Sequence, residues 1–127
     1  NKNAIGLMQI KPSTAKNPGF KKYGVKPIDP EKLKDPVVNR KWGTIYFNAL
    51  IQDFNNKYPN DKNEETIKKA LASYNWGIGN VRKLIRKHVN KWWFGHLPNT
   101  KEKGDVQAYV NKIIKRWNKN TRMEIIK

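Results

Sequence analysis

The stretch LASYNWGIGN, residues 71–80, brings together side chains that could do chemistry. They are the phenol of Tyr74 and the carboxamide of Asn75, followed closely by Gly77 and Gly79. Phenol and amide groups exchange hydrogen bonds with polar ligands, and glycine lets another group approach the main chain closely. The flanking sequence is mostly charged, whereas this stretch is small, aromatic and turn-forming. The pattern predicts a turn built for close approach, although Asn75 and Gly77 alone are most often a simple helix stop.

Metal-based and thiol-based centres are poorly supported by the composition. The chain contains no Cys, which excludes disulfides and thiolate metal sites. Its two histidines, His88 and His96, are isolated in the sequence, and such residues are more often surface or core residues than ligands. We therefore expect no metal and no cofactor.

The bulk properties describe a basic globular protein. With 127 residues, 37% of them hydrophobic, the chain is expected to form a single domain with one modest core. No apolar run reaches the roughly 20 residues that a transmembrane helix needs. The formal net charge of +17 predicts attraction to polyanions such as nucleic acid, anionic lipid or acidic cell-wall polymers. Because the lysines are spread along the whole chain, most of them are interpreted as a solvated face.

Helix-start signals and apolar periodicity predict an all-α protein. Asp35-Pro36 supplies a cap residue and a first-turn proline, and the helix that follows is expected to reach about Asn56. Its expected buried stripe is Val38, Trp42, Ile45, Ala49 and Phe54. Other helices are expected from Pro12, from Asn63 to the glycines at 77 and 79, over residues 81–89, and from about Asp105. Residues 92–94, Trp-Trp-Phe, are interpreted as a loop covering the core, with stacking on sugar faces as the alternative.

Four blocks occur in order along the chain. They are NAIGLMQIKPSTA (residues 3–15), DPVVNRKWGTIY (35–46), ALASYNWGIGNVRKL (70–84) and DVQAYV (105–110). Together they resemble the soluble lytic transglycosylases, lysozyme-like enzymes of the glycoside hydrolase family 23 type that cleave bacterial peptidoglycan. The resemblance covers residues 3–114 and implies an all-α, goose-type lysozyme-like fold. Two long motifs in the family's order are specific, whereas a lone Tyr-Asn-x-Gly would be weak.

The resemblance also implies roles for individual residues. The family uses one Glu, first as an acid toward the glycosidic oxygen and then as a base toward the sugar's own 6-hydroxyl. Tyr74 corresponds to the supporting catalytic residue whose hydroxyl lies beside that Glu. Substrate-binding roles fall to Met8, Gln9, Asn75 and Asp105, of which Asp105 stands where the family usually has the longer Glu. Gly43 and Tyr46 are assigned to packing.

The catalytic Glu of the family belongs to a helix that precedes the GLMQ segment. None of the five glutamates of this chain has a family-like catalytic context: Glu31, Glu64, Glu65, Glu102 and Glu124. We therefore expect that Glu upstream of Asn1, and residues 1–127 to be one domain of this type that is incomplete at its N-terminus. The alternative is a catalytically inactive relative that binds the wall.

The leading functional hypothesis is a peptidoglycan lytic transglycosylase, a lyase that leaves 1,6-anhydro-muramic ends. Its expected partners are glycan strands and anionic wall polymers, and its expected location is extracytoplasmic: the periplasm, the cell wall, the medium, or a phage or secretion machine. A nucleic-acid-binding protein is a weaker alternative, because only the charge and the aromatics favour it and no nucleic-acid-binding motif is present. The oligomeric state is not predicted.

Overall fold

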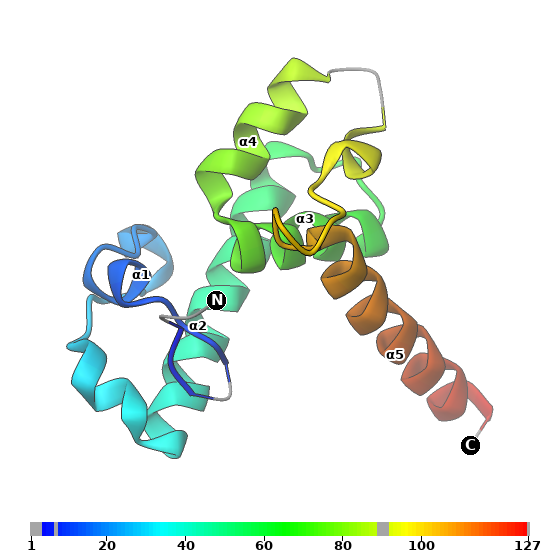
Figure 1. Cartoon of the computed structure of the whole chain (residues 1–127). Helices are drawn as coiled ribbons and strands as arrows, with labels where there is room; N and C mark the ends of the chain where they lie inside the picture. Colours follow the sequence, from blue (N-terminus) through cyan, green and yellow to red (C-terminus); the bar gives the residue numbers. More distant parts are fainter. Residues whose placement is uncertain (1–3, 7, 89–91, 127) are drawn as a thin grey trace. The chain divides into compact units, whose positions relative to one another are not determined.

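The computed structural model describes residues 4–6, 8–88 and 92–126, with side chains as far as residue 119. Its helices are α1 (Pro12–Lys16), α2 (Pro36–Lys57), α3 (Asn63–Trp76), α4 (Ile78–Lys87) and α5 (Val106–Ile126) (Figure 1). Three short 3₁₀ helices lie between them: η1 (Lys21–Tyr23), η2 (Pro30–Lys34) and η3 (Trp93–His96). The described ranges contain no β-strand, only an isolated bridge between Ile5 and Ile10. The predicted all-α class is confirmed.

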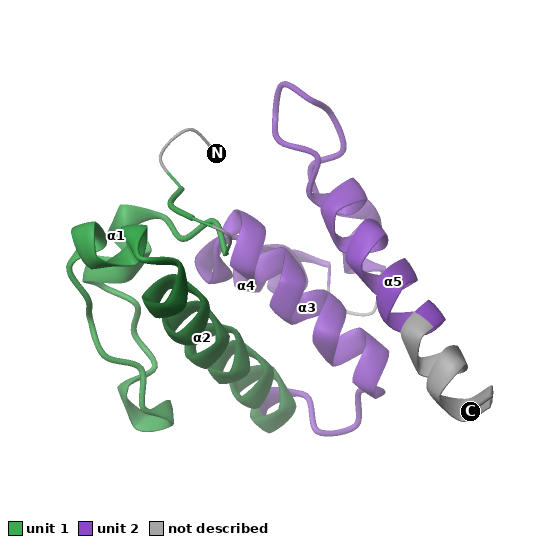
Figure 2. Cartoon of the chain, turned by 90° about the horizontal axis from the view of Figure 1, so that it is seen from below, with its two compact units in different colours: residues 1–56 green, residues 57–127 purple. Residues whose placement is uncertain are grey.

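The chain divides into two compact units, residues 1–56 and residues 57–127 (Figure 2). Unit 1 contains α1, η1, η2 and α2. Unit 2 contains α3, α4, η3 and α5. Each unit has its own buried residues and is described by itself.

Helix α2 is the main element of unit 1, and it begins where the sequence predicts. The Asp35 carboxylate accepts hydrogen bonds from the backbone N–H of Val37 (2.9 Å) and of Val38 (3.4 Å), so it caps the helix. The buried residues of α2 are Asn39, Trp42, Gly43, Tyr46, Ala49, Leu50, Asp53 and Phe54.

The buried face of α2 differs from the predicted stripe. Trp42, Ala49 and Phe54 are buried as expected, but Ile45 is 40% exposed and Val38 only half-buried. The face turns toward Asn39 and Gly43 because the N-terminal segment of unit 1 packs on these two residues. A pattern of apolar residues alone cannot reveal a face that is centred on a glycine and an amide.

Aromatic side chains of α2 hold the loop of unit 1 in place. Trp42 and Tyr46 stack, with ring centroids 5.5 Å apart, and the indole Nε1 of Trp42 donates to the carbonyl of Lys26 at 2.8 Å. Tyr46 is buried, in agreement with its predicted packing role. The loop that joins α1 to α2 is therefore fastened to the helix by the hydrogen bond from Trp42 and by Phe20, whose ring centroid lies 6.0 Å from that of Tyr46.

Helix α3 is the centre of unit 2, because it packs against both α4 and α5. Its Lys69 is buried, lies 3.8 Å from the centroid of the Tyr58 ring and forms an ion pair with Asp61 at 2.6 Å. This pair fixes the turn that precedes α3. In the part of the chain that the structure describes, no helix is both long enough and apolar enough to cross a bilayer.

Candidate functional site

The segment that contains Met8 and Gln9 is a tight turn in unit 1. Ile5 and Ile10 exchange backbone hydrogen bonds of 2.8 and 3.1 Å, which closes the turn. Gly6 and Gln9 lie in the left-handed region, with φ of 69° and 49°. The side-chain amide of Gln9 donates to the Gly6 carbonyl at 2.7 Å, so the turn stabilises a backbone conformation that is unusual for glutamine.

Asn39 fastens this turn to helix α2. Its carboxamide oxygen accepts from the backbone N–H of Met8 at 3.0 Å, and its Nδ2 donates to the carbonyl of Ile5 at 2.9 Å. The same Nδ2 donates to the carbonyl of Leu33 at 3.0 Å. Asn39 is fully buried, so these hydrogen bonds are shielded from water. One amide thereby joins the turn, η2 and α2.

Two glycines make room for this contact. A Cβ on Gly6 would lie 2.4 Å from the Nδ2 of Asn39, and a Cβ on Gly43 would lie 2.8 Å from both Cβ and Cγ of Met8. Asn39 and Gly43 are four residues apart, so both lie on the same face of α2. Gly43 therefore has the predicted packing role: it receives the side chain of Met8.

The side chain of Gln9 is more exposed than that of Met8 in this turn. Gln9 is exposed, whereas Met8 is half-buried, its side chain packs on Gly43 and its backbone N–H is bonded to Asn39. Of the two predicted substrate-binding residues in this segment, Gln9 therefore has the more accessible side chain. Leu7 lies outside the described residues.

The turn that contains Tyr74 and Asn75 lies in unit 2, where α3 gives way to α4. Gly77 has a φ of 105° and stands alone between the two helices; its N–H donates to the Ser73 carbonyl at 2.8 Å. At the end of α3, Tyr74 is half-buried and Asn75 is exposed. The turn thus leaves the Asn75 amide open to a ligand and gives partial access to Tyr74.

The prediction that both glycines end α3 is wrong for Gly79. Helix α4 begins at Ile78, and Gly79 lies in its first turn, without a left-handed φ. A single glycine, Gly77, is enough to reverse the chain between the helices. A Cβ on Gly79 would meet no atom within 4 Å, so this side of the first turn of α4 is open.

Asp105 is the N-cap residue of α5. Its carboxylate accepts from the backbone N–H of Ala108 at 2.9 Å, and its carbonyl accepts from the N–H of Tyr109 at 3.2 Å. The carboxylate is exposed. Nearby, burial raises the pKa of the Tyr109 phenol above its usual value, so this phenol is neutral at neutral pH. A structural role for Asp105 is therefore established, beside the substrate contact that the sequence predicts.

The Trp-Trp-Phe segment divides between core and surface. Trp93 and Phe94 are buried, and the Trp93 indole donates to a Glu65 carboxylate oxygen at 2.5 Å, which agrees with a core-covering loop. Trp92 is 66% exposed, and its ring lies over Gly95, where a Cβ would come within 2.9 Å of it.

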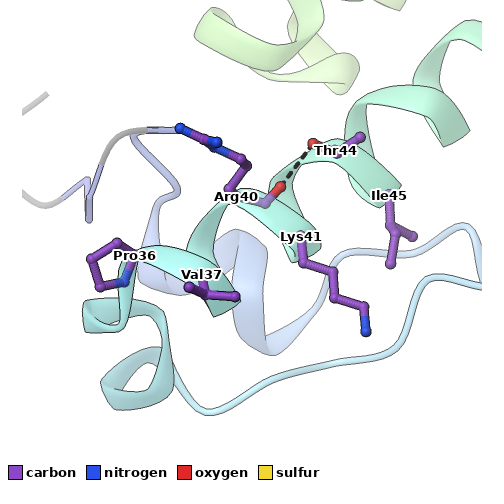
Figure 3. Close-up of a pocket in the computed structure, with 6 residues that line it drawn as sticks. All are labelled: Pro36, Val37, Arg40, Lys41, Thr44 and Ile45. Atoms are coloured by element: carbon purple, nitrogen blue, oxygen red, sulfur yellow. Dashed lines mark hydrogen bonds between the residues drawn. The ribbon is translucent and has the colours of Figure 1, made fainter.

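An open hollow follows the outer face of α2, and it contains none of the predicted site residues. It is lined mainly by apolar surface from Pro36, Val37, Arg40, Lys41, Thr44 and Ile45 (Figure 3). The Thr44 hydroxyl donates to the Arg40 carbonyl at 2.7 Å, so it bonds within the helix. Because a single helix supplies all of these residues, the hollow lacks the convergent polar groups of an active site.

The predicted site residues fall into two groups. Met8 and Gln9 lie together in unit 1; Tyr74 and Asn75 adjoin each other in unit 2, and Asp105 begins another helix of the same unit. In the described part of the chain, no group of three or more His, Asp or Glu residues could hold a metal ion.

Sequence reasoning assigned no role to Asn39, the residue that positions the Met8–Gln9 turn. A signal was available: Asn39 is an amide in the helix that begins at Pro36, three and four residues before Trp42 and Gly43. A polar residue at such a position is buried when it has fixed hydrogen-bond partners.

Comparison with known families gives a match over most of the chain. The family described as "Transglycosylase SLT domain" matches residues 1–92, a range that includes the Met8–Gln9 turn and the Tyr74–Asn75 turn but not Asp105. No solved structure matches the chain.

Proposed function

Because the chain belongs to the transglycosylase SLT domain family, we propose that it is the glycan-cleaving domain of a peptidoglycan lytic transglycosylase. The reaction cleaves the β-1,4 bond between N-acetylmuramic acid and N-acetylglucosamine without adding water. It leaves a 1,6-anhydro ring on the muramic residue. The family match carries this proposal, since it includes both turns that bear the predicted site residues.

The chemistry requires one residue that changes its protonation state twice. A carboxylic acid donates its proton to the glycosidic oxygen as the C1–O bond breaks. The resulting carboxylate then takes the proton of the C6 hydroxyl, whose oxygen forms the new bond to C1. By the family resemblance, we propose that this acid belongs to a helix that precedes the Met8–Gln9 turn.

The residues of this chain would bind and orient the sugar. Tyr74 would place its hydroxyl beside the acid and help to hold it. Gln9 and Asn75 would donate to and accept from sugar hydroxyl and acetamido groups, which their exposure supports. Asn39 would act as a positioning residue, because it fixes the backbone at Ile5 and Met8, just before Gln9, without reaching the surface itself.

Peptidoglycan as substrate fits an extracytoplasmic location, in the periplasm, the cell wall, the medium, or a phage or secretion machine. The excess of Lys and Arg over Asp and Glu, 27 against 10, would favour residence on an anionic wall.

The test is digestion of purified peptidoglycan by the full-length protein, with the released muropeptides identified by mass spectrometry. We expect muropeptides with 1,6-anhydro ends, one water lighter than the hydrolysis products. Tyr74→Phe should lower kcat by about tenfold or more, whereas Tyr23→Phe, which alters a surface phenol of unit 1, should leave it unchanged. Only hydrated products would make the protein a lysozyme-type hydrolase instead.

The second candidate is a non-catalytic wall-binding relative. None of the glutamates in residues 1–127 has a family-like catalytic context, which is the observation that favours it. It predicts that the full-length protein sediments with insoluble peptidoglycan and releases no muropeptides.

A further inference from the structure

Helix α5 carries a row of cations on the side opposite its buried stripe. We call this row the α5 ridge: Lys112, Lys115, Arg116 and Lys119. All four side chains are exposed, whereas Val106, Val110 and Ile114 are buried. At 100° per residue, the ridge occupies an arc of about 100° centred opposite the buried stripe, and it extends about 10 Å along the helix axis. Figure 1 shows the later turns of α5 continuing past α3 within the same unit.

The ridge has no internal charge compensation. In the described part of the chain, none of its four cations forms an ion pair, and the sequence from 106 to 119 contains no Asp or Glu. Lys112 and Arg116, like Lys115 and Lys119, are four residues apart, a spacing at which like charges destabilise a helix. An isolated α5 therefore has repulsion that a bound polyanion would relieve.

Most acidic residues of unit 2 bind groups outside the α5 ridge. Residues 57–127 contain 17 Lys and Arg against six Asp and Glu. Asp61 pairs with Lys69, Glu64 with Lys68, Glu65 accepts from Trp93, and Asp105 caps α5. Four of the six carboxylates thus already serve the turn, α3, η3 and the start of α5, and among the described side chains no carboxylate pairs with the ridge.

We propose that the α5 ridge binds a linear phosphodiester polymer of the cell wall. The choice of a wall polymer rests on the proposed function; the choice of a polyanion rests on the ridge. Cations that recur every three or four residues lie about 4.5 to 6 Å apart along the helix axis, so successive phosphates of an extended chain can each meet one. Arg116 can bind a phosphate through two parallel hydrogen bonds.

The ridge fits a simple polyanion better than single-stranded nucleic acid. Binding of single strands combines cations with aromatic side chains on which the bases stack. The exposed arc of α5 between residues 108 and 119 offers only Lys, Arg, Asn and Ala, and its one tryptophan, Trp117, is half-buried on the opposite side.

The experiment measures binding to glycan-free poly(glycerol phosphate) over a series of NaCl concentrations. The ridge variant carries K112Q, K115Q, R116Q and K119Q. The matched control carries K16Q, K21Q, K26Q and K32Q, which remove four exposed lysines of unit 1; three of them line a second hollow. Circular dichroism checks that both variants are folded, and glutamine retains a good helix propensity in α5.

We expect the ridge variant to lose about tenfold or more in affinity near 0.1 M NaCl. The slope of log K against log salt should become shallower by about 2 to 4, and the control should change by less than about threefold. Equal losses in both variants would overturn the proposal, because the binding would then depend on net charge alone. Tighter binding of duplex DNA at equal phosphate concentration would also overturn it, in favour of nucleic acid.

The test is independent of the proposed function, because the probe contains no glycan. Muropeptide release from peptidoglycan stripped of phosphate polymers reports the cleavage activity separately. Binding of the phosphate polymer can therefore fail while cleavage is observed, and cleavage can fail while binding is observed.

Discussion

Asn39 is buried and out of reach of a ligand, but it positions the turn that carries the exposed Gln9. Its carboxamide is fully buried and bonds to the backbone on both sides of Gly6, while Gln9 at the end of the same turn is exposed. Removal of Asn39 would take away the partner of the Leu33 carbonyl and of the Met8 N–H, and would leave the Ile5 carbonyl with its bond from the Ile10 N–H alone. Each such group costs about 1 to 3 kcal/mol, although a local opening of the turn can let water replace some of these bonds.

We predict that Asn39→Ala destabilises unit 1 by about 2 to 4 kcal/mol and releases the Met8–Gln9 turn. Asn56→Ala is the matched control on the same helix, since its amide donates only to the exposed hydroxyl of Tyr23 and its loss should cost less than about 0.5 kcal/mol. Urea unfolding gives the stabilities, and amide hydrogen exchange at residues 8 to 10 reports the turn. Unchanged exchange in Asn39→Ala would show that the turn holds without this amide.

At the scale of single elements, two helical glycines serve different purposes. Gly43 lies in α2 under Met8, whereas Gly79 lies in the open first turn of α4. Glycine in a helix is less stable than alanine by about 0.5 to 1 kcal/mol. At Gly43 a packing contact with Met8 requires glycine, whereas at Gly79 a Cβ would meet no atom within 4 Å.

The same substitution should therefore change stability in opposite directions at these two positions. Gly79→Ala should stabilise the protein by up to about 1 kcal/mol. Gly43→Ala should destabilise it by about 1 to 3 kcal/mol, because the new Cβ meets Met8 at its own Cβ, which cannot rotate away. Thermal unfolding followed by circular dichroism measures both. A stabilised Gly43→Ala would mean that the turn moves off α2 at little cost.

Helix α5 begins at a residue that could serve two functions. Asp105 caps the helix, and its exposed carboxylate also stands where the family resemblance predicts a substrate contact. Serine retains the cap but lacks the negative charge, whereas alanine has neither.

Asp105→Ala should lower stability by about 1 kcal/mol, and Asp105→Ser should restore most of that loss. Sedimentation with insoluble peptidoglycan then separates the two roles. If both variants bind the wall as the unchanged protein does, Asp105 is a cap and nothing more. If Asp105→Ser is stable but binds at least threefold more weakly, the carboxylate contacts the substrate.

At the scale of the whole molecule, the net charge of +17 opposes compaction. Like charges repel over a Debye length that is about 30 Å in 0.01 M salt and about 10 Å in 0.1 M salt. Ten acidic residues, of which Asp61 pairs with Lys69, cannot neutralise 27 cationic ones. Salt should therefore weaken repulsion more than it weakens attraction.

We predict that the urea midpoint rises as NaCl increases from 0.01 to about 0.3 M. The ridge variant, with four fewer positive charges, should show a smaller rise than the unchanged protein. A midpoint that falls with salt would indicate that attractive ion pairs dominate the stability instead.

The sequence by itself determined where most helices begin and end. Asp35-Pro36 starts α2, which ends at Lys57 where about Asn56 was predicted, and Asp105 caps the start of α5. Caps, prolines and glycines act within a few residues, so the helix ends that they set can be predicted from the local sequence. Ordered motifs also identified the family and the segments that bear Gln9 and Tyr74.

Only the tertiary structure decided which face of α2 is buried and what holds the Met8–Gln9 turn. The predicted stripe included Ile45 and gave Asn39 no role, because the partners of Asn39 lie 31 and 34 residues earlier in the chain. Contacts at that separation depend on how the chain returns to the helix, and no local propensity encodes them. Asn39 and Gly43 therefore support the Met8–Gln9 turn only because that distant segment packs on α2.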